Sequence, residues 1–112
     1  PKDWLIGVSA TNQAQAIIAK ENGADYIGVG PIYSTATKED AKQPIGTGGL
    51  TAIREVVVDL PIVPIGGIRL SHVFSLIDAG ADGVSVISAI SKAENPKKMA
   101  KAFSEHLRYK ID

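Results

Sequence analysis

The segment Tyr26–Lys38, which reads YIGVGPIYSTATK, decides how the chain is expected to fold. Its first residues are aliphatic, aromatic or glycine, which is typical of a buried β-strand, and Gly30-Pro31 ends that strand. A polar stretch follows at once, with hydroxyl or ammonium groups on Ser34, Thr35, Thr37 and Lys38. Hydroxyl donors beside an ammonium group suit an anion, so we predict a strand that leads into an anion-binding loop.

The same strand pattern occurs four times, and a helical pattern follows each strand. We expect strands at residues 4–10, 26–30, 62–65 and 83–87, and helices that begin near residues 12, 50, 71 and 95. The first strand is apolar almost throughout, which predicts burial on both of its faces. In the first helix, Ala14, Ile17 and Ile18 fall on one face and are expected to point inward. The triplet Gly-Ala-Asp precedes the second and the fourth strand, so the βαβα unit occurs twice.

Strands that alternate with helices predict a parallel sheet with helices packed against it. An open doubly wound sheet and a TIM (β/α)8 barrel both have that order of elements. Glycine or hydroxyl residues end every strand, at Ser9, Gly30, Gly66-Gly67 and Ser88, and ligand-binding loops at one end of all strands are typical of the barrel. Because a complete barrel has about 250 residues, four βα units correspond to half of one. We predict that residues 1–112 form a single partial domain, whose open strand edges need the missing half of the barrel or a second copy of the chain.

Two neighbouring strand ends form a candidate phosphate site. Gly66-Gly67 lets backbone N–H groups approach an anion closely, and a short helix after Ile87-Ser88 would present further N–H groups to it. In barrels, a phosphate often lies between the last two βα loops. The alternative is that Gly66-Gly67 only makes a tight turn.

The polar loop after the second strand is the other candidate site. Thr35 and Thr37 offer hydroxyl donors and Lys38 offers a mobile positive charge, which suits a phosphate or pyrophosphate. The alternative is a solvated loop without a ligand. Ser9 leaves its strand at the corresponding place, and its alternative role is to cap the helix that follows.

The remaining polar residues carry no clear signature of a general base or a metal site. His72 stands at a helix start and His106 on the last helix, and both are expected to be surface or packing residues. Asp25 and Asp82 precede strands, so we expect them to be turn residues at the opposite end of the sheet from the candidate site.

The composition argues against several classes of partner. Lys and Arg together number 12, as do Asp and Glu, so the formal net charge of zero gives no general attraction for nucleic acid or an anionic membrane. The chain has no cysteine for a disulfide or a thiolate metal site, which is compatible with a reducing cytoplasm. No apolar run is long enough to span a membrane. We expect a cytoplasmic protein that binds small phosphate compounds.

Five segments together resemble the thiamine phosphate synthase family, and they occur in the order and at the spacing of that family. They are IGVSA (residues 6–10), GADYIGVGPIY (23–33), TATK (35–38), IGGI (65–68) and GADGVSVISAI (80–90). The resemblance implies that the chain is the C-terminal half of the family's barrel, with strands five to eight. It also implies the family's reaction, in which an aminopyrimidine methyl pyrophosphate and a thiazole phosphate give thiamine phosphate and pyrophosphate. In that reaction, Mg2+ accompanies the pyrophosphate as it leaves.

The resemblance further assigns roles to residues of this chain. Ser9 and Lys38 would contact the pyrimidine pyrophosphate, and Thr35 and Thr37 would hold the thiazole substrate. Backbone groups of Gly67, Ile87 and Ser88 would bind the thiazole phosphate. The Mg2+ ligands of the family belong to the first half of its barrel, so this chain has no matching positions and is expected to be inactive alone.

Two alternatives remain beside the synthase. The related thiazole tautomerases share the barrel, but they carry a histidine in the loop after the sixth strand and lack the TxTK motif, whereas this loop reads GPIYSTATK. The other alternative is a half-barrel without catalytic activity, which binds a phosphate compound or assembles with a partner.

Overall fold

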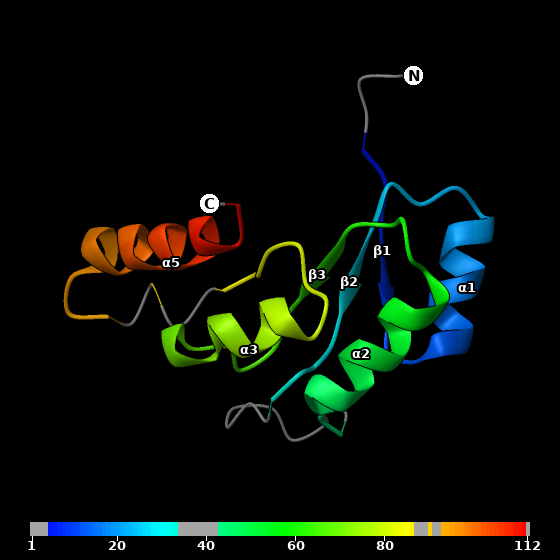
Figure 1. Ribbon diagram of the computed structural model, residues 1–112, viewed down its shortest axis with the longest axis horizontal. Helices are drawn as coiled ribbons and strands as arrows, with labels where there is room; N and C mark the ends of the chain where they lie inside the picture. Colours follow the sequence, from blue (N-terminus) through cyan, green and yellow to red (C-terminus); the bar gives the residue numbers. More distant parts are fainter. Residues whose placement is uncertain (1–4, 34–42, 87–89, 91–92, 112) are drawn as a thin grey trace.

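The computed structural model describes residues 5–33, 43–86, 90 and 93–111, and Figure 1 shows its strands running side by side with helices beside them. The elements in chain order are strand β1 (Gly7–Ala10), helix α1 (Gln13–Glu21), strand β2 (Tyr26–Val29), helix α2 (Gly46–Val56), strand β3 (Ile62–Pro64), the 3-10 helix η1 (Leu70–His72), helix α3 (Val73–Asp78) and helix α5 (Pro96–Ile111). The predicted alternation of strands and helices is confirmed for the first three βα units.

The three strands form one parallel sheet in the order β1-β2-β3. The register places Ala10 beside Val29 and Val29 beside Pro64, and it pairs Ile27 with Ile62. Because side chains alternate across a strand, these five residues share one face, and all five are buried. The hydrophobic core therefore lies between this face and the helices.

The helices form a second layer beside the sheet. Going along the chain, α1 contacts α2, α2 contacts α3, and α3 contacts α5 (Figure 1). Their buried side chains complete the core and include Ala16, Ala19, Leu50, Ile53, Val73, Leu76 and Phe103. Parallel strands in one layer and helices in a second layer, in the same order, make an α/β fold as predicted.

Two expectations about burial are wrong. Ile17 and Ile18 of α1 are 39% and 55% exposed, and Ala14 is exposed too, while Ala16 and Ala19 are buried. The small alanines form the buried side of α1, so the helix presents its larger isoleucines to the outside. β1 is not buried on both faces either, since only its last residue is buried.

The fourth predicted strand is reduced to one parallel bridge between Ile65 and Ser85 within the described residues. The Ser85 N–H donates to the Pro64 carbonyl at 2.9 Å. In a parallel strand, the N–H and the carbonyl of one residue point to the same side, so Pro64 lacks the donor that would extend pairing toward Gly83. Pro64 is the last residue of β3, and its missing donor interrupts the ladder to the next segment.

The repeated Gly-Ala-Asp triplet makes the same contacts twice. The Asp25 N–H donates to the Ile6 carbonyl and the Ile6 N–H donates to Asp25 Oδ2, both at 2.7 Å. Asp82 and Ile62 repeat this reciprocal pair, with both distances at 2.9 Å. Each aspartate thus binds the chain at the start of the neighbouring strand. The prediction of turn residues at the amino end of the strands is confirmed.

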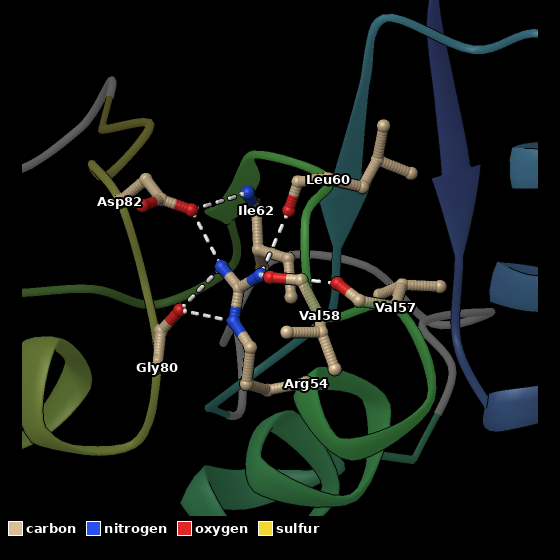
Figure 2. Close-up of polar contacts among 7 residues, drawn as sticks. All are labelled: Arg54, Val57, Val58, Leu60, Ile62, Gly80 and Asp82. Atoms are coloured by element: carbon tan, nitrogen blue, oxygen red, sulfur yellow. Dashed lines mark hydrogen bonds and ion pairs between the residues drawn. The ribbon is translucent and has the colours of Figure 1, made fainter.

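Arg54 joins the end of α2 to two other segments (Figure 2). Its guanidinium donates to four backbone carbonyl oxygens, those of Val57, Val58, Leu60 and Gly80, at 2.7 to 3.1 Å. The same group forms an ion pair with Asp82 at 2.5 Å. Three of these carbonyls lie in the connection after α2 and the fourth follows α3, so a cation with several donors satisfies irregular backbone and ties α2 to the start of β3.

Gly30 follows β2 at a point where the backbone leaves no room for a side chain. A Cβ atom there would overlap the Ile65 carbonyl oxygen, whereas a Cβ on Gly28 would have only the Val63 oxygen within reach, at 4.0 Å. We expect Gly30→Ala to lower the free energy of unfolding by about 2–3 kcal/mol. The matched Gly28→Ala should stay within about 0.5 kcal/mol. Urea unfolding of both variants measures this, and equal stabilities would contradict the close packing of Gly30 on Ile65.

Candidate functional site

The candidate site lies where the strands end, because backbone hydrogen bonds tie these ends together. The Gly30 N–H donates to the Ala10 carbonyl at 3.4 Å, which links the end of β2 to the end of β1. The Ile32 N–H donates to the Ile65 carbonyl at 2.9 Å, which links the segment after β2 to the segment after β3. The three carboxyl ends of the strands therefore form one continuous edge.

The loop after β2 is held at both of its ends. The Ile45 N–H donates to the Pro31 carbonyl at 2.9 Å, and the Gly46 N–H donates to the Ile32 carbonyl at 3.0 Å. We call these two hydrogen bonds the clasp. The clasp keeps the start and the end of residues 33–44 beside the end of β2. Three predicted site residues in this loop, Thr35, Thr37 and Lys38, lie outside the described residues, so their roles stay predictions.

Gly66-Gly67 makes the turn after β3 with two left-handed residues in a row, at φ values of 99° and 66°. A Cβ atom on Gly66 would come within 2.8 Å of Pro31 Cα, so only glycine fits this position. Within the described residues, the Gly67 N–H donates to no acceptor. A tight turn and a free backbone donor thus occur together at the predicted phosphate site. Ile87 and Ser88, predicted for the same phosphate, are outside the described part of the chain.

Ser9 lies on the face of the sheet opposite the helices. Its alternative role as a helix cap is wrong, because Asn12 Oδ1 accepts from the Gln15 N–H at 2.8 Å and caps α1. Ser9 instead lines a cavity of about 290 Å3, together with Gly7, Val8, Tyr26, Gly28, Val63, Ile65 and Ser85. We call this surface the open face. Its aromatic and aliphatic side chains stay accessible, with Tyr26 and Ile65 each 38% exposed.

Tyr33 and His72 form a stacked pair beside the glycine turn. Their ring centroids are 3.9 Å apart and the ring planes differ by 25°. His72 Nδ1 accepts from the Arg69 N–H at 2.9 Å, so the neutral ring carries its proton on Nε2. Burial raises the pKa of the Tyr33 phenol, while burial and the nearby Arg69 charge lower the pKa of His72. The expected packing role of His72 is confirmed, as is that of His106, which stacks on Phe74 at 4.9 Å.

The lowered pKa of His72 predicts a dependence of stability on pH. At a pH between the ordinary pKa of 6.5 and the lower pKa of the folded state, His72 binds a proton in the unfolded chain and not in the folded chain. The free energy of unfolding should therefore fall as the pH drops below about 6.5, whereas His72 should contribute no pH dependence above that value. His72→Phe keeps an aromatic ring and should lose this part of the pH dependence. Identical slopes for both proteins in urea titrations at several pH values would contradict the assignment.

The sequence model of the family described as thiamine monophosphate synthase matches residues 1–90. The chain belongs to the thiamine monophosphate synthase family. Among its relatives, the thiamine-phosphate synthase of Geobacillus kaustophilus is 52% identical over 106 residues, which cover 95% of this chain and 48% of the relative. The Bacillus licheniformis enzyme of the same name is 48% identical over 106 residues, or 95% of this chain and 47% of that enzyme. The chain thus spans about half the length of these thiamine-phosphate synthases.

Solved structures agree with the fold. The thiamine phosphate pyrophosphorylase of Pyrococcus furiosus superposes with a TM-score of 0.86 at 32% identity, over 99% of this chain and 52% of that protein. The 3-hexulose-6-phosphate synthase of Salmonella typhimurium superposes with a TM-score of 0.71 at 27% identity, over 94% of this chain and 50% of that protein. The parallel α/β arrangement of this thiamine monophosphate synthase family member is therefore shared with longer phosphate-handling enzymes.

Of the predicted site residues, the described part of the chain contains only Ser9 and Gly67. Gly67 follows the segment to which Ile32 and Tyr33 are hydrogen-bonded, and Ser9 lies on β1, which β2 separates from β3. Ser9 and Ile65 line the same cavity. Tyr33 and His72 were not predicted as parts of a site of a thiamine monophosphate synthase. The available signal was their position, since Tyr33 directly precedes the hydroxyl-rich loop and His72 starts the helix after the glycine pair.

Proposed function

We propose that this chain is the C-terminal half of a thiamine phosphate synthase barrel, with strands five to eight. The main support for the proposal is a pair of backbone hydrogen bonds between the segment after β2 and the segment after β3. The segment that leads to Thr35, Thr37 and Lys38 is hydrogen-bonded to the turn that holds Gly67, through Ile32 to Ile65 and through Tyr33 to Gly66. The residues that lead into the hydroxyl-rich loop are thereby adjacent to the glycine turn, at the carboxyl edge of a parallel sheet, where ligands bind in such folds.

The reaction we propose joins 4-amino-2-methyl-5-(diphosphooxymethyl)pyrimidine to thiazole phosphate and releases pyrophosphate. The thiazole nitrogen forms a bond to the pyrimidine methylene carbon as the bond from that carbon to the pyrophosphate oxygen breaks. Because the leaving group departs with its charge, the reaction depends on anion binding and positioning more than on a protein base. The described residues accordingly offer backbone donors and a stacked pair rather than an activated base.

Each predicted residue has a distinct part in this proposal. Ser9 and Lys38 contact the pyrimidine pyrophosphate, and the Lys38 ammonium balances the charge of the leaving group. Thr35 and Thr37 hold the thiazole substrate. Backbone groups of Gly67, Ile87 and Ser88 bind the thiazole phosphate, which is supported at Gly67 by the left-handed turn and the free N–H.

The Mg2+ of the proposed reaction needs ligands from elsewhere. Among the described residues, no three His, Asp or Glu side chains are grouped so that they could hold a metal ion. This donor set does not fit a magnesium site, so we derive no catalytic step through the metal. We propose that residues outside this chain bind it.

The open face suggests where the rest of the site lies. Tyr26, Val63 and Ile65 form an accessible apolar surface around Ser9, and the matched relatives are about twice as long as this chain. We propose that the part of the family barrel that this chain does not match covers the open face. A second copy of this chain is the competing occupant, and the mass of the chain in solution separates the two.

A product assay with both substrates and Mg2+ tests the proposed function. The samples are the chain alone, and the chain fused to the part of the Geobacillus kaustophilus synthase that it does not match. We expect thiamine phosphate from the fusion and none from the chain alone. Turnover by the chain alone would contradict the need for the other part, and a folded but inactive fusion would favour a binding role without catalysis.

The cellular location of the reaction is part of the same proposal. No helix in the described part of the chain is both long and apolar enough to cross a membrane. The sequence has no cysteine and no net charge. We propose a cytoplasmic location, which a fluorescent fusion of the chain would test.

A further inference from the structure

We propose that Tyr33 and His72 are a positioning pair, which fixes the residue that enters the thiazole-binding loop against the phosphate-binding turn. This inference rests on the proposed function, since it assigns these two loops to the thiazole phosphate. Neither residue is proposed to touch the substrate. Their role is to set the relative position of the two segments that do.

The stack connects two loops that are far apart in the sequence. Tyr33 follows β2 and His72 ends η1, yet their ring centroids are only 3.9 Å apart. Both side chains are partly buried, so the contact excludes water from one side of each ring. Aromatic pairs in this arrangement contribute stabilisation beyond the area that they bury.

His72 is itself held in place by the backbone. Its Nδ1 accepts from the Arg69 N–H at 2.9 Å, so the imidazole caps the start of η1 in the manner of a capping box. The ring therefore has a fixed orientation before Tyr33 stacks on it. A residue with an amide acceptor could keep the cap without the stack, and a phenyl ring could keep the stack without the cap.

Tyr33 is fixed on its other side. Its N–H donates to the Gly66 carbonyl at 3.0 Å, and the Gly66 Cα leaves no space for a side chain beside Pro31. The backbone bond sets the distance between the two loops, while the stack prevents rotation about that bond. Tyr33 directly precedes Ser34, so the stack determines where the chain enters the loop with Thr35, Thr37 and Lys38.

Four single variants and one double variant of the active fusion separate the contribution of each ring to the contact. Tyr33→Leu and His72→Gln remove a ring, and each should raise the KM for thiazole phosphate by about tenfold with little change in the KM for the pyrimidine substrate. Tyr33→Phe and His72→Phe keep a ring and should recover most of this loss. The double variant Tyr33→Leu/His72→Gln should be no worse than either single variant, because both remove the same contact. Melting temperatures of all variants show whether a variant is folded.

The outcomes are distinct. A KM for thiazole phosphate that is unchanged in Tyr33→Leu and His72→Gln would overturn the proposal. A Tyr33→Phe variant as weak as Tyr33→Leu would overturn it too, since the phenol would then act on the substrate itself. If the unmodified fusion is inactive, the proposed function fails, and amide NMR shifts of the chain alone decide the positioning. Shifts at Gly66 and Gly67 that change in Tyr33→Leu and not in Tyr33→Phe support the pair, and unchanged shifts in both contradict it.

Discussion

Lys38→Ala is expected to lower the turnover of the active fusion by about 10²- to 10³-fold, the usual effect of removing a group that stabilises developing charge. In the proposed reaction, the Lys38 ammonium balances the charge that accumulates on the departing pyrophosphate. No other residue proposed for the site in this chain is positively charged, so its loss is not compensated from within the chain. Steady-state assays with both substrates saturating measure this as a fall in kcat.

A second lysine provides the matched control. Lys97 is an exposed residue in the first turn of α5, and Lys97→Ala removes the same charge from the chain. Its turnover should stay within about twofold of the parent fusion, because an exposed charge on that helix is screened by solvent. Equal losses in the two variants would mean that net charge matters rather than the position of Lys38, and the site assignment would be wrong.

Arg54→Met is expected to lower the free energy of unfolding by about 2–4 kcal/mol, the largest effect among substitutions outside the site. The change removes the donors that satisfy four carbonyl groups, and methionine keeps most of the aliphatic packing. Only 22% of the Arg54 side chain is exposed, so water restores these hydrogen bonds incompletely. Urea unfolding of the chain measures the difference and does not depend on any catalytic activity.

Asp82→Asn tests whether the ion pair or the hydrogen bonds to the carbonyl groups contribute more of the stability that Arg54 provides. The Asp82 side chain is 44% exposed, and asparagine keeps an oxygen that accepts from the Ile62 N–H. This variant should therefore lose less than about 1 kcal/mol. If it were as unstable as Arg54→Met, the ion pair and not the set of carbonyl groups would dominate at this junction.

Much of the fold could be predicted because it follows from patterns of neighbouring residues in the sequence. The strand at Tyr26–Val29 and the helices around Leu50 and Pro96 follow from apolar periodicity and from glycine and proline at their ends. The pairing after β3 could not be read in this way. Proline lacks a backbone donor in any strand, but only the register with Ser85 shows that the missing donor of Pro64 faces the fourth segment.

Burial was harder to predict than secondary structure. The pattern of α1 allows either the isoleucines or the alanines to face the core, and hydrophobicity alone favours Ile17 and Ile18. The structure buries Ala16 and Ala19. For β1, an apolar strand predicts two covered faces, but among the described residues only the helices cover it. The sequence shows what a strand can bury and cannot show which chain supplies the cover.

The residue types of the candidate site could be predicted from the sequence, whereas the contacts that hold the site together could be predicted only in part. Gly66-Gly67 carried its own signal, because two adjacent glycines after a strand indicate unusual backbone angles. For Tyr33 and His72, the sequence shows only that each stands beside a predicted site loop, and it does not show that the two rings stack. Such contacts depend on the register of β2 and β3, which the sequence does not specify.

The clasp has a consequence for how such enzymes diversify. Because Ile45 and Gly46 close the loop onto Pro31 and Ile32, the sheet does not depend on what lies between them. Doubling the length of a closed loop costs only about 0.6 kcal/mol in chain entropy. Residues 34–44 can therefore be exchanged as one unit, whereas Tyr33 belongs to the fixed part because it bonds to Gly66 and stacks on His72. Under the proposed function, evolution or a designer could replace this segment, and with it the preferred substrate, while the rest of the domain keeps its sequence.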